Sequence, residues 1–273
     1  MKSSLKVLAL SVFVVAASSS WAAEPRQQET LKALVGSDYV FPSSANVQGV
    51  GAYFRTRLVL TNPTGSEITV LATLSTPTGL SASVPIALTS FQTRVYENFL
   101  ADVFGYTGGG GVNLVEQGAA TGGVRKPFLA VAEVYVDAAT GRYSTPVTGL
   151  SPDDMVVKPT ETGFSMVTGL RADGTNRANF GCSNADIVPV TVRAEIYTSS
   201  TPKLGSPAAV EEFSLAAGGW GQKAVPVQDD LIRILYSVSS GGGDLGVYCY
   251  GVNVNNASND GTSIPASYAP LVP

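Results

Sequence analysis

The feature that most constrains this chain is an alternation of apolar residues that occurs twice along the sequence at the same spacing. Each run follows an asparagine, Asn62 in the first and Asn184 in the second. The corresponding apolar positions are Ile68, Val70, Ala72 and Leu74, and Val190, Val192, Ala194 and Ile196. A period of two places such side chains on one face of a β-strand. Two copies of one pattern therefore predict two copies of one β domain.

Short alternating segments separated by Gly, Pro and Asx turns extend over both copies, and we expect strands there. The predicted strands are 52–61, 67–75, 82–88, 90–96, 112–116 and 127–136, then 164–171, 177–183, 188–198, 209–215, 221–227, 233–239 and 245–254. A short crossing helix is predicted in each copy, at 97–105 and at 228–232. The pattern predicts an all-β fold of two tandem β-sandwich domains, 38–150 and 164–273, joined by a linker at 151–163.

The first 22 residues have the features of a signal peptide. Lys2 and Lys6 precede an apolar run of about 11 residues, and Ser20-Trp21-Ala22 predicts cleavage after Ala22. A retained anchor is the alternative, but that run is shorter than the roughly 20 residues a spanning helix needs. We therefore expect an exported protein, periplasmic or extracellular, that does not insert into a membrane after leader removal. Residues 23–37 are predicted to be a mobile lead-in.

Charge and composition restrict the partners and the chemistry. Removing Lys2 and Lys6 from 17 basic residues, against 21 acidic ones, leaves a net charge of −6. The absence of a basic stripe argues against nucleic acid and anionic membrane surfaces as partners. The chain has no histidine, which excludes Ser-His-Asp and Cys-His catalysis and histidine metal sites. We expect no cofactor, no metal and no enzymatic activity; a histidine-free carboxylate hydrolase is the catalytic alternative.

The two cysteines, Cys182 and Cys249, both lie in the second copy. An even number in an exported chain favours a disulfide. Their aligned positions in the first copy, Leu60 and Val131, are apolar, so we expect an inward-facing pair that bridges two sheets. Two buried free thiols are the alternative.

Several short motifs resemble those of exported bacterial proteins with tandem immunoglobulin-like β-sandwich domains. The motifs are Phe54-Arg55-Thr56-x-Leu58, Asn176-Arg177-x-Asn179-x-Gly181 and Tyr250-Gly251-Val252-Asn253. The resemblance implies immunoglobulin-like sandwiches with a structural or interaction role, and it supplies no catalytic residues. The chain departs from the family pattern at Arg57, where an acid is usual, and at Cys182, where an aliphatic residue is usual.

Four residues recur in both copies and are predicted to be structural: Arg55, Asn62, Arg177 and Asn184. The arginines precede the repeated strand, where each would hold a neighbouring loop through hydrogen bonds. A pair of ligand-facing guanidinium groups is the alternative.

Aromatic residues of the second copy are the candidate ligand-binding residues. If Val247 and Cys249 face the core, alternation turns Tyr248 and Tyr250 outward. They would stack on a sugar or protein partner, or pack against the other domain or the linker. Trp220, between glycines, is a loop aromatic with the same two interpretations.

Two other polar or glycine-rich stretches receive structural interpretations. The glycine tracts at 108–111 and 241–243 lack the P-loop context and are predicted to be flexible strand connections. Residues 256–261 form an Asx-rich turn, or, alternatively, a weak calcium loop.

These observations favour an exported, non-catalytic β-sandwich protein with a structural or interaction role at the cell surface, in the periplasm or outside the cell. Its expected partner is a protein or a glycan. The alternatives are a carbohydrate-binding module built on Tyr248, Tyr250 and Trp220, and the carboxylate hydrolase.

Overall fold

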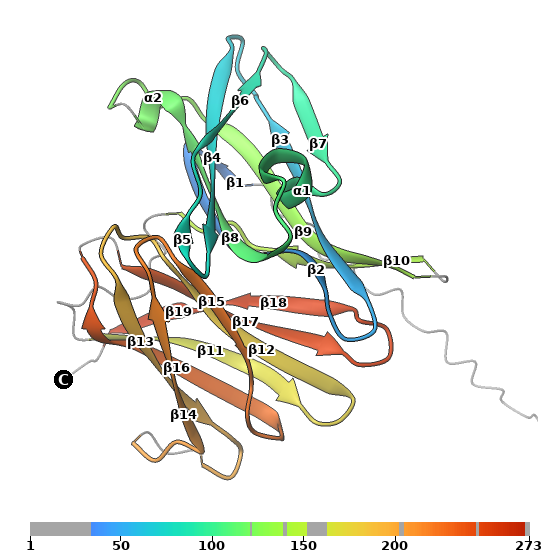
Figure 1. The fold of residues 1–273 in the computed structure, drawn as a ribbon, viewed down its shortest axis with the longest axis vertical. Helices are drawn as coiled ribbons and strands as arrows, with labels where there is room; N and C mark the ends of the chain where they lie inside the picture. The colour runs from blue at the N-terminus through green and yellow to red at the C-terminus, as the bar shows by residue number, and fades with distance from the viewer. Residues whose placement is uncertain are drawn as a thin grey trace, which may run out of the picture. The chain divides into compact units, whose positions relative to one another are not determined.

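Antiparallel strands make up nearly all of the secondary structure in the computed structural model (Figure 1). It describes residues 34–120, 122–138, 141–151, 163–201, 205–243 and 246–270, which belong to one compact unit. The predicted signal peptide, residues 23–33 of the predicted lead-in and residues 152–162 of the predicted linker lie outside the described residues. The lead-in prediction is wrong for Leu34–Gly36, which form a strand paired with residues 128–130. Residues 34–151 are called the first half below, and residues 163–270 the second half.

The first half contains ten strands and two short helices among its described residues. In chain order they are β1 (Leu34–Gly36), β2 (Asp38–Gln48), β3 (Tyr53–Thr61), β4 (Ile68–Thr76), β5 (Gly79–Leu80), β6 (Val84–Leu88), β7 (Thr93–Tyr96), α1 (Phe99–Phe104), β8 (Gly108–Glu116), α2 (Gln117–Ala120), β9 (Phe128–Ala138) and β10 (Gly141–Val147).

These ten strands form one sheet that folds over a shared core. β3 pairs with β9 along one edge, and on its other edge with β2 and then β7. β4 pairs with β6 and β8, and β8 pairs with β2, so β2 joins the two layers. The predicted alternation holds, because Ile68, Val70, Ala72 and Leu74 are all buried in the core between the layers.

The second half contains nine strands among its described residues. They are β11 (Gly163–Ala172), β12 (Asn176–Asn184), β13 (Val190–Tyr197), β14 (Ala209–Leu215), β15 (Trp220–Ala224), β16 (Asp229–Gly241), β17 (Val247–Asn255), β18 (Gly261–Pro265) and β19 (Ser267–Pro270). One sheet has the order β14-β13-β16-β11-β19 and the other β15-β12-β17-β18, with a core between them. The chain is thus all-β, with sandwich-like packing of antiparallel sheets.

The strand pairing of one half corresponds to that of the other. In the first half, β4 lies between β6 and β8. In the second half, β13 lies in the same way between β14 and β16. Likewise, β3 pairs with β7 and β9, and β12 pairs with β15 and β17. Leu60 pairs with Ala130 where Cys182 pairs with Cys249. Ala130 is therefore the counterpart of Cys249, and the predicted alignment with Val131 is wrong by one residue.

Of the two predicted helices, only the one in the first half exists. α1 ends at Gly105, whose φ of 61° is the left-handed conformation that glycine adopts readily at a helix end. Its Phe99 and Leu100 are buried in the first core. The helix predicted at 228–232 is wrong, because β16 begins at Asp229 and pairs there with β11. The partner strand supplies backbone hydrogen bonds that outweigh the weak helical pattern of this segment.

Neither helix in the described part of the chain has the length and apolarity needed to cross a membrane.

Candidate functional site

Asn62 and Asn184 hold equivalent turns in the two halves. The Asn62 side chain is fully buried and its Nδ2 donates to the carbonyl oxygens of Ser66 and Thr89, at 2.8 and 2.9 Å. Asn184 Nδ2 donates likewise to the carbonyls of Val188 and Ala216, at 2.9 and 2.8 Å. In both, Oδ1 accepts the backbone N–H two residues on. Buried carbonyls need such partners, so both asparagines have a structural role.

The two repeated arginines have different electrostatic environments. Arg55 lies on β3, and its Nη1 is 3.3 Å from Asp137 Oδ2 of β9. Asp137 also pairs with Arg142, which in turn pairs with Glu97. The Arg142 guanidinium holds the pKa of the Glu97 carboxyl below its usual value. Arg55 is therefore one member of a surface network in which positive and negative charges alternate.

Arg177 has amide partners where Arg55 has a carboxylate. Its Nη1 donates to Asn256 Oδ1 at 3.1 Å and its Nη2 to Asn259 Oδ1 at 2.8 Å. It therefore holds the 256–260 loop, as the structural interpretation predicts. No ion pair joins Arg177 to a carboxylate among the described residues, and burial lowers the pKa of its guanidinium. The group still stays protonated at neutral pH.

The loop that Arg177 holds is an Asx turn. Asn255 Oδ1 accepts the backbone N–H groups of Ala257 and Ser258, and Asn256 Nδ2 donates to the carbonyl of Gly174. The Oδ1 atoms of Asn256 and Asn259 already accept from a guanidinium. A calcium ion on these oxygens would lie beside that positive charge, which disfavours the calcium interpretation.

Cys182 and Cys249 form a disulfide, with both side chains buried and a Cα–Cα distance of 4.1 Å. The predicted location between two sheets is wrong. The cysteines are direct register partners on β12 and β17, neighbouring strands of one sheet. Opposed residues of antiparallel strands lie close enough for this bond.

Tyr248 and Tyr250 do not form an exposed platform: they retain 2% and 0% of their accessible surface. Alternation does place them on the face opposite Val247 and Cys249, which belong to the second core. That face is covered by the first half, where Tyr248 packs with Val40 and Leu150. The prediction of ligand-stacking tyrosines is therefore wrong, and packing between the halves accounts for Tyr248.

Trp220 is the first residue of β15 and, contrary to the loop interpretation, is largely buried. Its Nε1 donates to the carbonyl oxygen of Pro42 at 3.0 Å. The β2–β8 register shifts between Phe41 and Ser44, so Pro42 lies at a bulge where its carbonyl is available to another partner. This hydrogen bond joins the two halves.

The glycine tract at 108–111 is strand, not a flexible connection, because it begins β8 and pairs with β2. A Cβ on Gly109 would lie 2.7 Å from Trp220 Cη2, and one on Gly111 would lie 2.9 Å from Ser183 Oγ. These glycines let the second half approach the β8 backbone.

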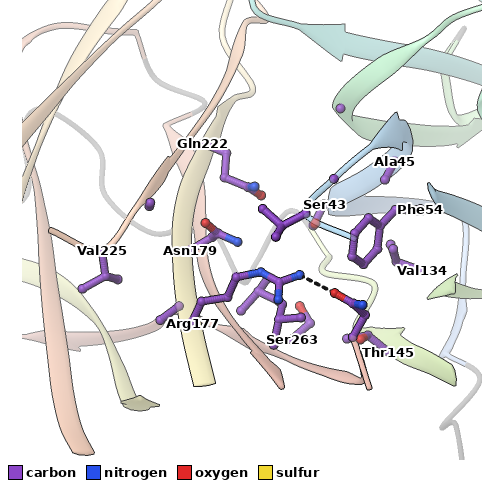
Figure 2. Close-up of a pocket in the computed structure, with 18 of the residues that line it drawn as sticks. Ser43, Ala45, Phe54, Val134, Thr145, Arg177, Asn179, Gln222, Val225 and Ser263 are labelled. Atoms are coloured by element: carbon purple, nitrogen blue, oxygen red, sulfur yellow. Dashed lines mark hydrogen bonds between the residues drawn. The ribbon is translucent and has the colours of Figure 1, made fainter. Parts of the chain in front are cut away.

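A cleft of about 740 Å³ lies beside this contact and is lined by both halves (Figure 2). Apolar walls come from residues such as Phe54, Val134, Val147, Val225, Val252 and Val254. The polar groups include Asn179, Gln222, Gln228, Ser43, Thr145 and Ser263. Trp220 lines the cleft where the halves meet. Such a volume, with mostly apolar walls and a few polar groups, is typical of small-molecule sites.

Arg177 is the one charged side chain among the described residues that line the cleft, and none of those residues carries a carboxylate. Figure 2 shows its side chain extending from β12 into the cleft, between Asn179 on one side and Thr145 on the other. Of the residues predicted to bind ligand, only Trp220 lines the cleft. Of those predicted to be structural, only Arg177 does.

Most of the cleft was not predicted from the sequence. Phe54 and Asn179 belong to the repeated motifs, but nothing in the sequence indicated that they face a shared cavity. Comparison with known proteins does not identify the site either. No protein-family model matches the chain, and no curated protein matches it.

Proposed function

We propose that this chain is an exported, non-catalytic protein of two tandem immunoglobulin-like β-sandwich domains that acts by binding, in the periplasm, at the cell surface or outside the cell. The corresponding strand pairing of the two halves supports the tandem arrangement. The buried disulfide is consistent with an oxidising compartment.

The observation that carries the proposal is the cleft lined by both halves. Its walls are apolar, its polar groups are mainly neutral amides and hydroxyls, and its described lining contains no carboxylate. Apolar walls with a few convergent polar groups favour binding of a ligand or a partner segment. General acid–base or nucleophilic chemistry of the glycosidase type needs a pair of carboxylates, which the described lining does not provide.

The carbohydrate-binding alternative is weakened by the burial of Tyr248 and Tyr250. Sugar recognition by stacking needs an exposed aromatic face, and Trp220 is itself mostly covered. Amides such as Asn179 and Gln222 can still hydrogen-bond to hydroxyl groups, so a glycan array belongs in the test.

The test uses residues 23–273 as bait for affinity capture from the organism's own culture, together with a glycan array. Ala224 is exposed and lines the cleft, so Ala224→Trp is designed to fill it. Ala87 is exposed on β6 and does not line the cleft, so Ala87→Trp is the matched control.

We expect a specific partner or glycan to bind the wild type and Ala87→Trp, and to be lost with Ala224→Trp. Retention of that partner by Ala224→Trp would show that the cleft is not the binding site.

A further inference from the structure

The two repeated arginines differ in whether a carboxylate neutralises their charge. Arg55 pairs with Tyr135 in the β3–β9 ladder, and Arg177 pairs with Val254 in the β12–β17 ladder. Two residues after these register partners come Asp137, near the end of β9, and Asn256, the first residue after β17. Asp137 neutralises Arg55, whereas Asn256 gives Arg177 only a neutral amide oxygen. The second half thus has the same arginine with an amide at the position where the first half has a carboxylate.

The Arg177 guanidinium has remaining hydrogen-bonding capacity. It has five N–H donors, and two of them are used by Asn256 and Asn259. No carboxylate among the described residues balances its charge, and burial lowers its pKa. A half-buried cation beside apolar walls favours an anion, because both the Coulomb energy and the charge-assisted hydrogen bonds are stronger there than in bulk water.

We propose that the cleft binds an organic anion, with its negatively charged head group on Arg177 and its apolar body between the walls formed by Phe54, Val134, Val252 and Val254. This rests on the proposed function, since it specifies the ligand class of the same cleft. The planar guanidinium suits carboxylate, sulfonate or phosphate oxygens. The volume of about 740 Å³ accommodates a ligand much larger than the head group alone.

Two fluorescent probes with the same aromatic ring system separate the contributions of charge and of apolar surface to binding. 1-Anilinonaphthalene-8-sulfonate carries a sulfonate, and N-phenyl-1-naphthylamine has the same rings without it. Trp220 lines the cleft and is the one tryptophan that follows the predicted leader. Energy transfer from Trp220 to either probe reports binding, because both probes absorb tryptophan emission, and titration of residues 23–273 yields both dissociation constants. Since energy transfer acts over tens of ångströms, the comparison of Arg177 variants with Arg55 variants is what places the anion in the cleft.

We expect the sulfonate probe to bind more tightly than the neutral probe. Arg177→Gln should weaken the sulfonate probe roughly 10- to 100-fold, the range expected for loss of a charged hydrogen bond, and change the neutral probe little. Arg177→Lys should keep most of the preference, because the charge remains.

Two further variants use the duplication as a control. Arg55→Gln removes the corresponding arginine outside the cleft and should leave both probes unaffected. Asn256→Asp gives Arg177 the carboxylate that Arg55 already has, and should abolish the preference for the anion while the arginine is still present. Near-ultraviolet circular dichroism of each variant verifies that the fold is retained.

The outcomes separate this inference from the proposed function. If both probes bind equally and Arg177→Gln affects neither, the cleft binds ligands but the anion inference is wrong. If neither probe binds, the anion inference is wrong, and the capture experiment with Ala224→Trp decides separately whether the cleft binds a protein or glycan partner.

Discussion

At the scale of single residues, a repeated residue has the same role only where its partners also repeat. Asn62 and Asn184 keep both their donors and their acceptors, since each binds carbonyls of its own turn and of a neighbouring strand connection. Arg55 and Arg177 keep the guanidinium, but the partner changes from a carboxylate to an amide. The role therefore follows from the pair of groups and not from the arginine alone.

The asparagine turns make a prediction at this scale. Asn62→Ala and Asn184→Ala should each lower the free energy of unfolding by about 2–3 kcal/mol, because buried carbonyl oxygens lose their donor. Asn62→Asp should cost more than Asn62→Ala, since a carboxylate oxygen would then face those carbonyls. Urea denaturation measures both, with the exposed Thr262→Ala as control. Wild-type stability in Asn62→Ala would contradict the structural role.

At the scale of elements, strand pairing decides what local patterns leave open. The segment 228–232 has apolar spacing that allows a helix, but β11 pairs with it and makes it strand. The glycines at 108–111 have no intrinsic preference for strand, yet β2 pairs with them. Strand β2 itself was missed, because Pro42 and the surrounding serines obscure its alternation. Its pairing with β8 and its bulge are tertiary features.

The β12–β17 pair makes the second prediction. Cys182→Leu with Cys249→Ala installs the residues that the first half has at these positions, Leu60 and Ala130. The double variant should fold with its sheet intact and lose about 2–4 kcal/mol of unfolding free energy, the usual contribution of one disulfide. Urea midpoints with and without dithiothreitol measure this effect.

The reductant is also the control for this variant. It should destabilise the wild type toward the level of the double variant and leave the variant unchanged. Equal midpoints for the oxidised wild type and the variant would show that the bond contributes nothing to stability.

At the scale of the whole molecule, the face of the second half that alternation assigns to the outside is covered by the first half. Tyr248 packs on Val40 there, and Trp220 bonds to Pro42 across the same contact. The cleft lies beside this contact, and its lining includes Gly109 and Trp220 as well as Asn256 and Asn259. Its lining comes from strands far apart in the sequence, and no single segment contains the site.

The close contact at β8 makes the third prediction. Gly109→Ala would place a Cβ 2.7 Å from Trp220 Cη2, and it should cost about 1–3 kcal/mol by overpacking. The tryptophan emission should also shift to the red as the indole becomes more exposed. Gly65→Ala is the matched control, since a Cβ at Gly65 meets nothing within 4 Å. Equal emission and stability for both variants would contradict a tight contact between the halves.

The sequence by itself determined the all-β character, most strand positions, the structural asparagines and the proximity of the two cysteines. These follow from residue type and from a period of two, which act over a few neighbouring positions. The tertiary structure decided which strands are neighbours, that the disulfide lies within one sheet, and that the tyrosine face is covered. It also decided that Asp137 and Asn256 are counterparts, which an alignment one residue out of register conceals. Burial and charge compensation depend on groups distant in the chain, and local patterns contain no information about those groups.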